Sequence, residues 1–503
     1  MTQLSLGIDV GTTGLKAVLL DPERGVVASA ERPHELRSPH PAWAEEDANQ
    51  WWVTTVSAVR QLLEVVPAAS VAAIGVSGMV PAMVLLDARG DPLRPSIQQN
   101  DARAAAEVDE LRDSVDVSEF FRRTGGVPNQ QNVGPRWRWL MTNEPEVIAH
   151  AARLVGSYDY ITYRLTGTFS LEQNWAAESG LYDVTAHMWH APYLAQAGIS
   201  AALLPDVRPP DAVVGGVSVD AAAATGLVAG TPVMAGSADH VAAALAAGLT
   251  MNGDVLLKFG GAGDILYCAE SPEPDPHFYF DYHDIPGLTL INGCMASSGS
   301  LVKWFARELA GSADLGALDR EAALVPPGSG GVIVLPYFLG EKTPIFDPAA
   351  RGVFAGVMLH HTRANLYRAT LESVCYGFAH HLALLREAGR PITRVRVADG
   401  GSRSALWMQM AADVTGETVA VVGGDAASAL GVAYVAAMGA GLARDWSDIQ
   451  RFAPTGAVYT PRPEANKVYQ RGFALYRELY ERIRPVLHTL GDIGGPEAQT
   501  TAP

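Results

Sequence analysis

Short apolar runs separated by tight turns dominate the first part of the chain, a pattern typical of strands in an α/β protein. The runs of strand length are Leu4–Val10, Lys16–Leu20, Val26–Glu31, Val71–Ser77 and Ala82–Leu86. An amphipathic stretch from about Asn49 to Val66 predicts a helix, and Asp47 is placed to cap its first turn. The Gly78–Pro81 turn joins the last two runs. This order predicts a mixed sheet with crossing helices.

A similar order recurs after about residue 250, which predicts a fold-level duplication. Strand-like runs at Asp254–Lys258 and Ile265–Cys268 surround a glycine-rich turn. Helices are expected at Ser298–Ala310, Asn365–Ala388, Ala405–Thr415 and Ala427–Ala440. A polar stretch at Thr250–Gly253 separates the two apolar blocks, so we expect domains at 1–249 and 250–488. The segment 489–503 is rich in Gly, Pro, Thr and Ala and is expected to be a disordered tail.

Composition narrows the class of protein. A length of 503 residues is too great for one hydrophobic core, and a formal charge of −17 argues against nucleic acid or an anionic membrane as partner. The three cysteines, Cys268, Cys294 and Cys375, show no metal-ligand spacing and read as buried thiols in a reducing compartment. Neither a signal peptide nor an apolar run of membrane length is evident. We therefore expect a cytoplasmic enzyme.

The turn after the first strand carries the most informative chemistry. Asp9 ends the strand, Gly11 lets the backbone approach a phosphate, and Thr12 and Thr13 add hydroxyl donors. Lys16 brings positive charge nearby, and a carboxylate at the position of Asp9 is suited to Mg²⁺. The motif is neither a P-loop nor a GxGxxG loop. An ordinary β-hairpin with a Gly-Thr turn is the alternative interpretation.

Further small-residue turns carry possible chemistry. Asp239 opens an alanine-rich helical run, where its carboxylate is suited to act as a general base, with a plain helix N-cap as the alternative. Gly260–Gly263 is suited to phosphate binding through backbone amides, with a hairpin turn as the alternative. Asp399–Ser404 follows a strand and precedes a helix, and its glycines would let a flat adenine ring lie against the backbone.

Taken together, these motifs resemble the FGGY carbohydrate kinase family. The most specific match is Gly352–Val357, followed after seven residues by Asn365–Glu372, which fits the C-terminal signature of the family. The elements that occur in family order are the Asp-x-Gly-Thr-Thr turn, Pro41–Asp47 with Trp52, Asn100–Arg103 and Gly400–Ser402. The resemblance covers nearly the whole chain and is strongest toward xylulokinase-like members.

The resemblance implies two ribonuclease-H-like domains around a central cleft, as in the superfamily that includes actin and the Hsp70 chaperones. It implies ATP and Mg²⁺ as cofactors, sugar bound mainly by 1–249 and ATP mainly by 250–488. Asp239 becomes the catalytic base and Asp9 the metal-associated carboxylate. The implied contacts to ATP phosphates and adenosine are Gly11, Thr12, Thr13, Lys16, Gly260, Gly261, Gly263, Gly400, Gly401 and Ser402.

The expected sugar contacts depart from the family pattern. Met79, Val80 and Pro81 stand where xylulokinases usually carry Gln-Met-His, so polar hydroxyl readers are missing and a different hydroxyl pattern is expected to be accepted. His240 stands where Asn is usual and is expected to contact sugar, with a helix-start histidine that faces solvent or a neighbouring loop as the alternative.

Three acidic or basic residues complete the expected sugar region. Asp101 and Arg103 are expected near the sugar pocket, with a surface ion pair as the alternative. Glu178 lies in a region that often borders the sugar site of the family.

The second phosphate turn also departs from the family. Gly260–Gly263 reads Gly-Gly-Ala-Gly instead of Gly-Thr-Ser-Gly, so two hydroxyls are missing, although backbone amides still suit phosphate. We predict an ATP-dependent kinase for a terminal hydroxyl of a ketopentose or a related sugar or polyol. The alternatives are a kinase for a tetrulose, hexulose or polyol, a non-catalytic sugar or nucleotide sensor, and an actin- or chaperone-like ATPase. A homodimer is a further expectation from the family.

Overall fold

A computed structural model of the protein describes all residues except 1–2, 272, 424–426 and 494–503. The chain forms two compact units that interleave in sequence. Unit 1 comprises residues 1–250, 270–290 and 424–453, and unit 2 comprises residues 251–269, 291–423 and 454–503. The chain first leaves unit 1 after Thr250, but it returns twice, which a simple division of the sequence at residue 250 does not anticipate.

Unit 1 is built on a mixed sheet in the order β13-β14-β5-β1-β2-β3, with β15 also paired to β5. The strands are β1 Leu4–Val10, β2 Gly14–Asp21, β3 Gly25–Pro33, β5 Val71–Gly78, β13 Val213–Gly216, β14 Pro232–Met234 and β15 Ser237–Ala238. β1 is antiparallel to β2 and parallel to β5, and β5 is parallel to β14. The strands expected from the apolar runs at 4–10, 16–20, 26–31 and 71–77 are therefore confirmed.

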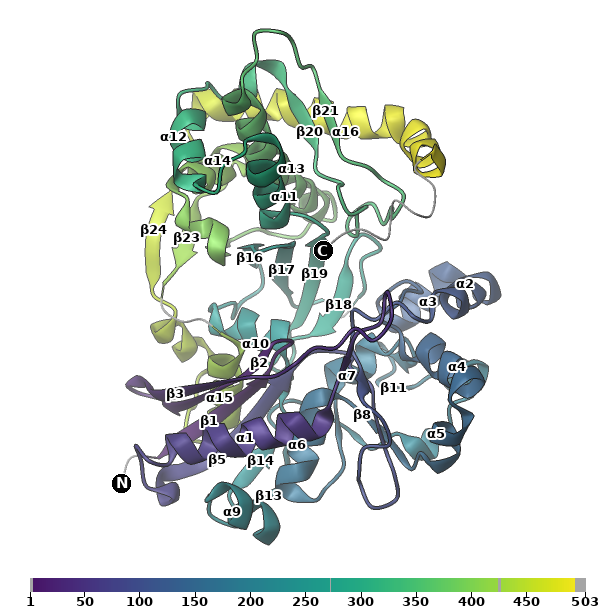
Figure 1. Ribbon diagram of the computed structural model, residues 1–503. Helices are drawn as coiled ribbons and strands as arrows, with labels where there is room; N and C mark the ends of the chain where they lie inside the picture. Colours follow the sequence, from purple (N-terminus) through teal and green to yellow (C-terminus); the bar gives the residue numbers. More distant parts are fainter. Residues whose placement is uncertain (1–2, 272, 424–426, 494–503) are drawn as a thin grey trace. The chain divides into compact units, whose positions relative to one another are not determined.

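Helices flank this sheet and continue into an outer part of unit 1 (Figure 1). They are α1 Ala48–Leu62, α2 Ala105–Ser114, α3 Val117–Thr124, α4 Val133–Asn143, α5 Pro145–His150, α6 Ser157–Thr166, α7 Gln173–Glu178, α8 Ala191–Ala197, α9 Val219–Thr225, α10 Asp239–Ala246 and α15 Ser428–Gly439. The expected cap of α1 is confirmed, because the Asp47 side chain accepts a hydrogen bond from the Asn49 N–H.

Unit 1 also contains short strands outside its main sheet. They are β4 Glu45–Glu46, β6 Val84–Leu86, β7 Ser96–Ile97, β8 Arg153–Val155, β9 Leu171–Glu172, β10 Tyr182–Asp183, β11 Met188–Trp189, β12 Val207–Arg208 and β18 Tyr279–Tyr282. β4 pairs with β7 and β6 pairs with β8, so the apolar run at 82–86 forms a strand outside the main sheet.

Unit 2 repeats the central arrangement of unit 1. Its strands β19-β17-β16-β22-β23-β24 lie in this order in one sheet. β16 is antiparallel to β17 and parallel to β22, β22 is parallel to β23, and β23 is antiparallel to β24. The same directions relate β1, β2, β5, β14 and β13 in unit 1. The expected fold-level duplication is confirmed in strand order and direction.

Unit 2 contains the predicted strands at 254–258, 265–268 and 394–397 and the predicted helices at 365–388 and 405–415, together with elements that were not predicted, whereas the predicted helix at 427–440 belongs to unit 1. The strands are β16 Asp254–Phe259, β17 Gly263–Ala269, β19 Thr289–Met295, β20 Ile333–Leu335, β21 Val353–Ala355, β22 Arg394–Ala398, β23 Val419–Val422 and β24 Thr455–Tyr459. The helices are α11 Gly299–Trp304, α12 Leu315–Ala323, α13 Arg363–Glu387, α14 Ala405–Thr415 and α16 Pro463–Ile493.

Two helices differ from the prediction. The predicted helix at 298–310 is divided, because α11 passes into a π-helical turn at Phe305–Leu309. The last helix, α16, continues to Ile493 although disorder was expected from residue 489, and residues 494–503 lie outside the described part of the chain. One glycine within a long helix costs only about 1 kcal/mol, so Gly491 does not end α16.

Close glycine packing places α15 against the sheet of unit 1. A Cβ atom on Gly7 of β1 would overlap the Ala429 carbonyl oxygen and lie 2.8 Å from the Ala433 Cβ. A Cβ on Gly75 of β5 would lie 2.5 Å from the Val432 carbonyl oxygen. The missing side chains therefore let the backbone of a helix from near the end of the chain rest directly on β1 and β5, next to α10 (Figure 1).

Replacing Gly7 with alanine is expected to destabilise unit 1 by about 1–3 kcal/mol, because the added methyl group has to push α15 away from β1. The melting temperature of the variant measures this effect. Gly126→Ala is the control, since a Cβ at Gly126 meets nothing within 4 Å. Equal melting temperatures for the two variants would contradict the packing argument.

Candidate functional site

The carboxyl ends of three parallel strands of unit 1 bring the expected catalytic residues together. Asp9 of β1 is in register with Ser77 of β5, and Ser77 is in register with Ser237 of β15. Asp239 follows β15 directly. The Ser77 hydroxyl donates to Asp9 Oδ1 at 2.8 Å. In α/β proteins this edge of the sheet is where ligands commonly bind.

The electrostatic setting of Asp9 suits a bound cation. Burial and then the Asp239 carboxylate raise the pKa of Asp9 to about 7, although the Ser77 hydrogen bond and the charge of Lys16 oppose the rise. Lys16 itself forms an ion pair with the exposed Glu31 at 3.5 Å. A divalent cation would offset both the burial and the repulsion between the two carboxylates. The oxygen donors present therefore fit Mg²⁺.

The turn after β1 is closed by its own backbone. The Gly11 N–H donates to the Gly14 carbonyl oxygen at 3.1 Å, and the Thr13 carbonyl accepts from the His34 N–H at 3.2 Å. The Thr12 hydroxyl donates to the Met79 sulfur at 2.8 Å, whereas Thr13 is exposed. β1 and β2 form a β-hairpin, so the hairpin interpretation describes the backbone of this segment correctly. The turn of the hairpin nevertheless lies beside Asp9.

Asp239 is the first residue of α10, and Ala238 occupies the N-cap position. The N-cap interpretation of Asp239 is therefore wrong. Its Oδ1 atom accepts a hydrogen bond from the His240 N–H at 2.6 Å, and 35% of its side chain is exposed. A partly exposed carboxylate at the strand edge is accessible to a substrate hydroxyl.

His240 faces acidic side chains on both of its ring nitrogens. Nε2 lies 3.0 Å from Asp281 Oδ2 and 3.9 Å from Glu178 Oε1, and Nδ1 lies 3.5 Å from Asp239 Oδ1. Burial lowers the pKa of His240, but Asp281, Asp239 and Glu178 together hold it well above its usual range. His240 does not face solvent, because only 24% of its side chain is exposed and its nitrogens face carboxylates of other segments, and its contact with sugar stays a prediction.

The 79–81 segment is an apolar wall held by backbone contacts. Met79 and Val80 are buried, and so is Pro81. The Ser157 hydroxyl donates to the Met79 carbonyl at 3.0 Å, and Arg136 Nη2 donates to the Pro81 carbonyl at 2.8 Å. The segment thus presents little polarity beyond its backbone.

Asp101 and Arg103 form a buried ion pair, and the surface alternative is wrong because both side chains are fully buried. Arg103 Nη2 lies 2.7 Å from Asp101 Oδ2 and 2.8 Å from Glu45 Oε1. The guanidinium also stacks on Trp43, with 3.8 Å between Cζ and the ring centroid. Arg103 Nη1 is buried and finds no hydrogen-bond partner among the described residues.

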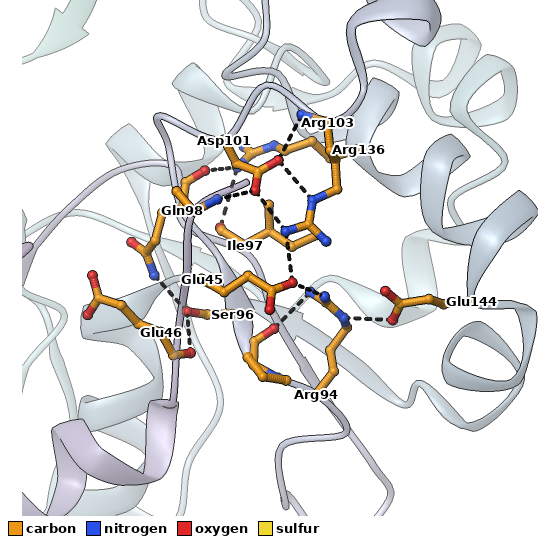
Figure 2. Close-up of polar contacts among 12 residues, drawn as sticks. Glu45, Glu46, Arg94, Ser96, Ile97, Gln98, Asp101, Arg103, Arg136 and Glu144 are labelled. Carbon is orange, nitrogen blue, oxygen red and sulfur yellow. Dashed lines mark hydrogen bonds and ion pairs between the residues drawn. The ribbon is translucent and has the colours of Figure 1, made fainter. Parts of the chain in front are cut away.

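Figure 2 shows how this pair extends into a network. Glu45 also pairs with Arg94, and Arg94 Nε in turn donates to Glu144 at 2.8 Å. Asp101 Oδ2 accepts from the Ala44 N–H at 2.6 Å. The network joins β4, β7 and the end of α4 through alternating charges.

Arg136 was not anticipated from the sequence. Its side chain is fully buried on α4, and it donates to the carbonyl groups of Pro81, Gln98 and Gln131. Burial lowers its pKa to about 9, with Asp101 as the main opposing influence. Arg136 therefore ties the 79–81 segment to two neighbouring loops, and no local sequence pattern reveals such a bridge.

Unit 2 contains the other expected binding turns. Gly260 and Gly261 lie between β16 and β17, and their carbonyl groups accept from Gly299 N–H at 2.8 Å and Ser298 N–H at 2.9 Å. Gly263 is buried, and a Cβ there would lie 2.5 Å from the Met295 methyl. The second turn is thus held against the start of α11, with Gly261 exposed.

The third turn follows β22 and forms a short 3₁₀ helix over Gly400–Arg403. Asp399 has a φ of +71°, a strained value for a residue other than glycine. Gly400 faces open space, whereas a Cβ on Gly401 would lie 2.6 Å from the Trp407 ring. The Ser402 hydroxyl donates to the Asp399 carbonyl at 2.7 Å. An open glycine face suits a flat ring.

Family comparison agrees with this geometry. Residues 4–246 match the model of the N-terminal domain of the FGGY family of carbohydrate kinases, and residues 261–440 match the model of its C-terminal domain. The chain belongs to the FGGY family of carbohydrate kinases. It is therefore a phosphotransferase with an alcohol group as acceptor and ATP as substrate.

Individual relatives span the full length of this carbohydrate kinase. It is 30% identical to the xylulose kinase of Escherichia coli (strain K12), over 96% of this chain and 99% of that protein. It is 29% identical to the L-xylulose/3-keto-L-gulonate kinase of the same strain, over 96% and 98%. The crystal structure of xylulose kinase from Rhodospirillum rubrum is similar with a TM-score of 0.93 and 44% identity, over 97% and 100%.

Within the described part of the chain, none of the helices combines the length and the apolar character that crossing a bilayer would need.

Replacing Glu45 with glutamine is expected to destabilise unit 1 by about 3 kcal/mol, because Arg94 and Arg103 lose a shared buried counter-charge. The corresponding fall in melting temperature is roughly 6–12 °C. Glu35→Gln serves as the matched control, since Glu35 pairs with Arg37 on the surface and about 1 kcal/mol or less is expected there. Similar losses in both variants would refute a structural role for the network.

Proposed function

We propose that this carbohydrate kinase transfers the γ-phosphoryl group of ATP to a terminal hydroxyl of xylulose or a closely related ketopentose. The observation that carries the proposal is the convergence of Asp9, Ser77 and Asp239 at the carboxyl edge of β1, β5 and β15. The names of the full-length relatives support xylulose as the acceptor. The reaction takes place in the cytoplasm on a small sugar, and a homodimer is part of the proposal, whereas nucleic acid and membrane partners are not.

In this proposal Asp239 accepts the proton of the attacking hydroxyl. Its carboxylate is partly exposed and sits at a helix start, so a sugar hydroxyl can reach it. Asp9 would hold Mg²⁺, which would neutralise charge on the ATP phosphates. Gly11 would let a phosphate approach the backbone, and the Thr12 and Thr13 hydroxyls and Lys16 would contact phosphate oxygens. Phosphoryl transfer needs mainly positioning and charge neutralisation, which this small set can supply.

The second unit supplies the remaining nucleotide contacts in the proposal. Gly260, Gly261 and Gly263 would offer backbone donors to phosphate, and Gly400, Gly401 and Ser402 would line the adenosine site. The open face of Gly400 supports this role, because a base can approach the backbone there. Residues 250–488 would then bind mainly ATP, and residues 1–249 mainly sugar.

The acceptor pocket is proposed to combine apolar and charged groups. Met79, Val80 and Pro81 would form its apolar wall, and His240 would line the pocket beside Asp239 and contact the sugar. Asp101 and Arg103 would shape the pocket from behind, since nearly all of their polar atoms are already paired. Residues 79–81 offer no polar side chain that could hydrogen-bond a sugar hydroxyl. A sugar hydroxyl left unpaired there is expected to cost about 1–3 kcal/mol of binding free energy, which would change the preference among epimers.

Substituting Asp239 with asparagine is expected to lower kcat at least about 100-fold, because the amide cannot accept the hydroxyl proton. Sugar-dependent ADP release measures kcat, and circular dichroism checks the fold. Asp220→Asn is the control, since Asp220 is an exposed carboxylate in the first turn of α9 and is expected to leave kcat unchanged. Near wild-type kcat in the Asp239 variant would sink the assignment of the base.

A coupled ADP-release screen over pentuloses, tetruloses, hexuloses and polyols is expected to give the highest kcat/KM with xylulose. Omission of Mg²⁺ should abolish turnover, and Asp9→Asn should raise the Mg²⁺ concentration required for half-maximal rate at least about tenfold. ATP hydrolysis that is independent of every sugar would instead support an ATPase. ATP binding without turnover would support a sensor.

A further inference from the structure

The 270–290 segment, which returns to unit 1, places an additional acidic residue at the candidate active site. β18 carries Asp281, of which 1% of the side chain is exposed. Asn174 of α7 fixes the backbone next to it, because its Oδ1 accepts from the Tyr282 N–H at 2.8 Å and its Nδ2 donates to the Tyr282 carbonyl at 3.0 Å. The position of Asp281 is therefore set by a buried two-point contact.

The contacts of His240 favour a proton on each ring nitrogen. Nε2 lies 3.0 Å from Asp281 Oδ2, and Nδ1 lies 3.5 Å from Asp239 Oδ1. A neutral imidazole carries one N–H and would turn a lone pair toward one of the two carboxylates. The doubly protonated ring donates a hydrogen bond from Nε2 to Asp281 and turns the Nδ1–H toward the Asp239 carboxylate as an ion pair, so it matches both partners.

Only one of the two acids behind the ring is needed as an anion. Burial, followed by repulsion from Asp281, holds the pKa of Glu178 well above its usual range. Glu178, 3.9 Å from Nε2, is thus the acid that more readily carries a proton, while Asp281 makes the closer contact to His240 at 3.0 Å. This division explains how two carboxyl groups fit within ligand-like distance of one histidine.

Charged groups from several elements face this cluster. Asp284 follows β18, interacts with His240 and has a pKa raised by burial to about 7. Asp9 of β1 interacts with Asp239, and Lys16 of β2 interacts with Asp9. Arg136 of α4 interacts with Glu178. The surroundings are thus acidic overall, which favours a positive charge on the ring.

A metal ion is the competing use of Glu178, His240 and Asp281, whose ligand atoms lie within 4.8 Å of one another. A metal requires an unprotonated ring nitrogen. Nε2 instead makes a direct 3.0 Å hydrogen bond to Asp281 Oδ2.

We propose that Asp281 is a positioning residue that holds His240 as an imidazolium beside the catalytic base Asp239. Both contacts of His240 to Asp239, from its backbone N–H and its ring, go to Oδ1. The carboxylate is thereby fixed with Oδ2 left for the acceptor hydroxyl. The catalytic part of this inference rests on the proposed kinase function, whereas the charge of the ring does not.

The direct test is ¹⁵N-histidine NMR of the full-length protein, with His240 assigned through the His240→Asn variant. In the wild type the ring is expected to remain doubly protonated well above pH 6.5. In Asp281→Asn its titration is expected to shift down by roughly one pH unit or more, because the buried counter-charge is lost. Glu178→Gln, which imitates a protonated acid, is the matched control and is expected to shift it much less.

His150 provides an internal reference, since it is exposed on α5 and its titration should be the same in all variants. A wild-type His240 that titrates at or below pH 6.5 overturns the proposal, even if Asp281→Asn does not fold. Equal shifts in the Asp281 and Glu178 variants overturn it as well, as does stoichiometric Zn²⁺ binding that His240→Asn abolishes.

The catalytic consequence is read from kcat/KM as a function of pH. The alkaline limb for Asp281→Asn is expected to fall at lower pH than the wild-type limb, and His240→Asn/Asp281→Asn should be no worse than His240→Asn alone. A wild-type protein without sugar-dependent ADP release refutes the proposed function but leaves the NMR result standing. An unchanged NMR titration in Asp281→Asn with an active kinase refutes only the positioning role.

Discussion

The contact of α15 with β1 and β5 is the constraint on which the geometry of unit 1 depends. Glycines at 7 and 75 remove the side chains that would hold the helix away from the sheet. β1 and β5 are parallel neighbours. Because α15 packs across the middle of both strands, it fixes the position of one strand relative to the other. The positions of Asp9 and Ser77, near the ends of these strands, are therefore fixed by the same packing. Dense packing transmits such constraints because protein interiors are close-packed and hardly compressible.

Charge balance is the second organising feature of the site. Asp9, Asp239, Asp281 and Asp284 gather in one region of a protein that already carries a formal charge of −17. Several groups offset this negative charge. A hydroxyl and a lysine lie near Asp9, and an imidazole lies between Asp239 and Asp281. An anionic nucleotide would enter such a site only with a cation and with backbone amides as donors. The acidic composition and the proposed chemistry are therefore compatible.

Local features of the sequence were sufficient to predict much of the fold. The strands β1, β2, β3 and β5 follow from short apolar runs, and the turn around Thr12 lies within one hairpin, so all of its residues are neighbours in sequence. The position of Asp239 at a strand-to-helix junction was readable for the same reason. In each case the evidence lies within about ten residues, where periodicity and turn chemistry act.

Long-range partners could not be predicted in this way. Asp281 reaches His240 only because the chain re-enters unit 1, and Arg136 reaches three carbonyl groups that carry no side-chain signal. Arg103 was expected at a pocket or on the surface, but the sequence did not indicate that Glu45 and Trp43 would enclose it. Such contacts depend on tertiary packing rather than local preference.

The interleaving of the two units also affects how the protein is made. A chain leaving the ribosome exposes β1 and β5 early, yet the helix that covers their glycines belongs to residues 428–439. Domains usually fold in order as they emerge. Unit 1 cannot complete its core in that order, so its sheet stays partly uncovered while residues 251–269 and 291–423 of unit 2 are synthesised. The strand edge that carries Asp9 and Ser77 therefore becomes fully ordered only at a late stage of synthesis.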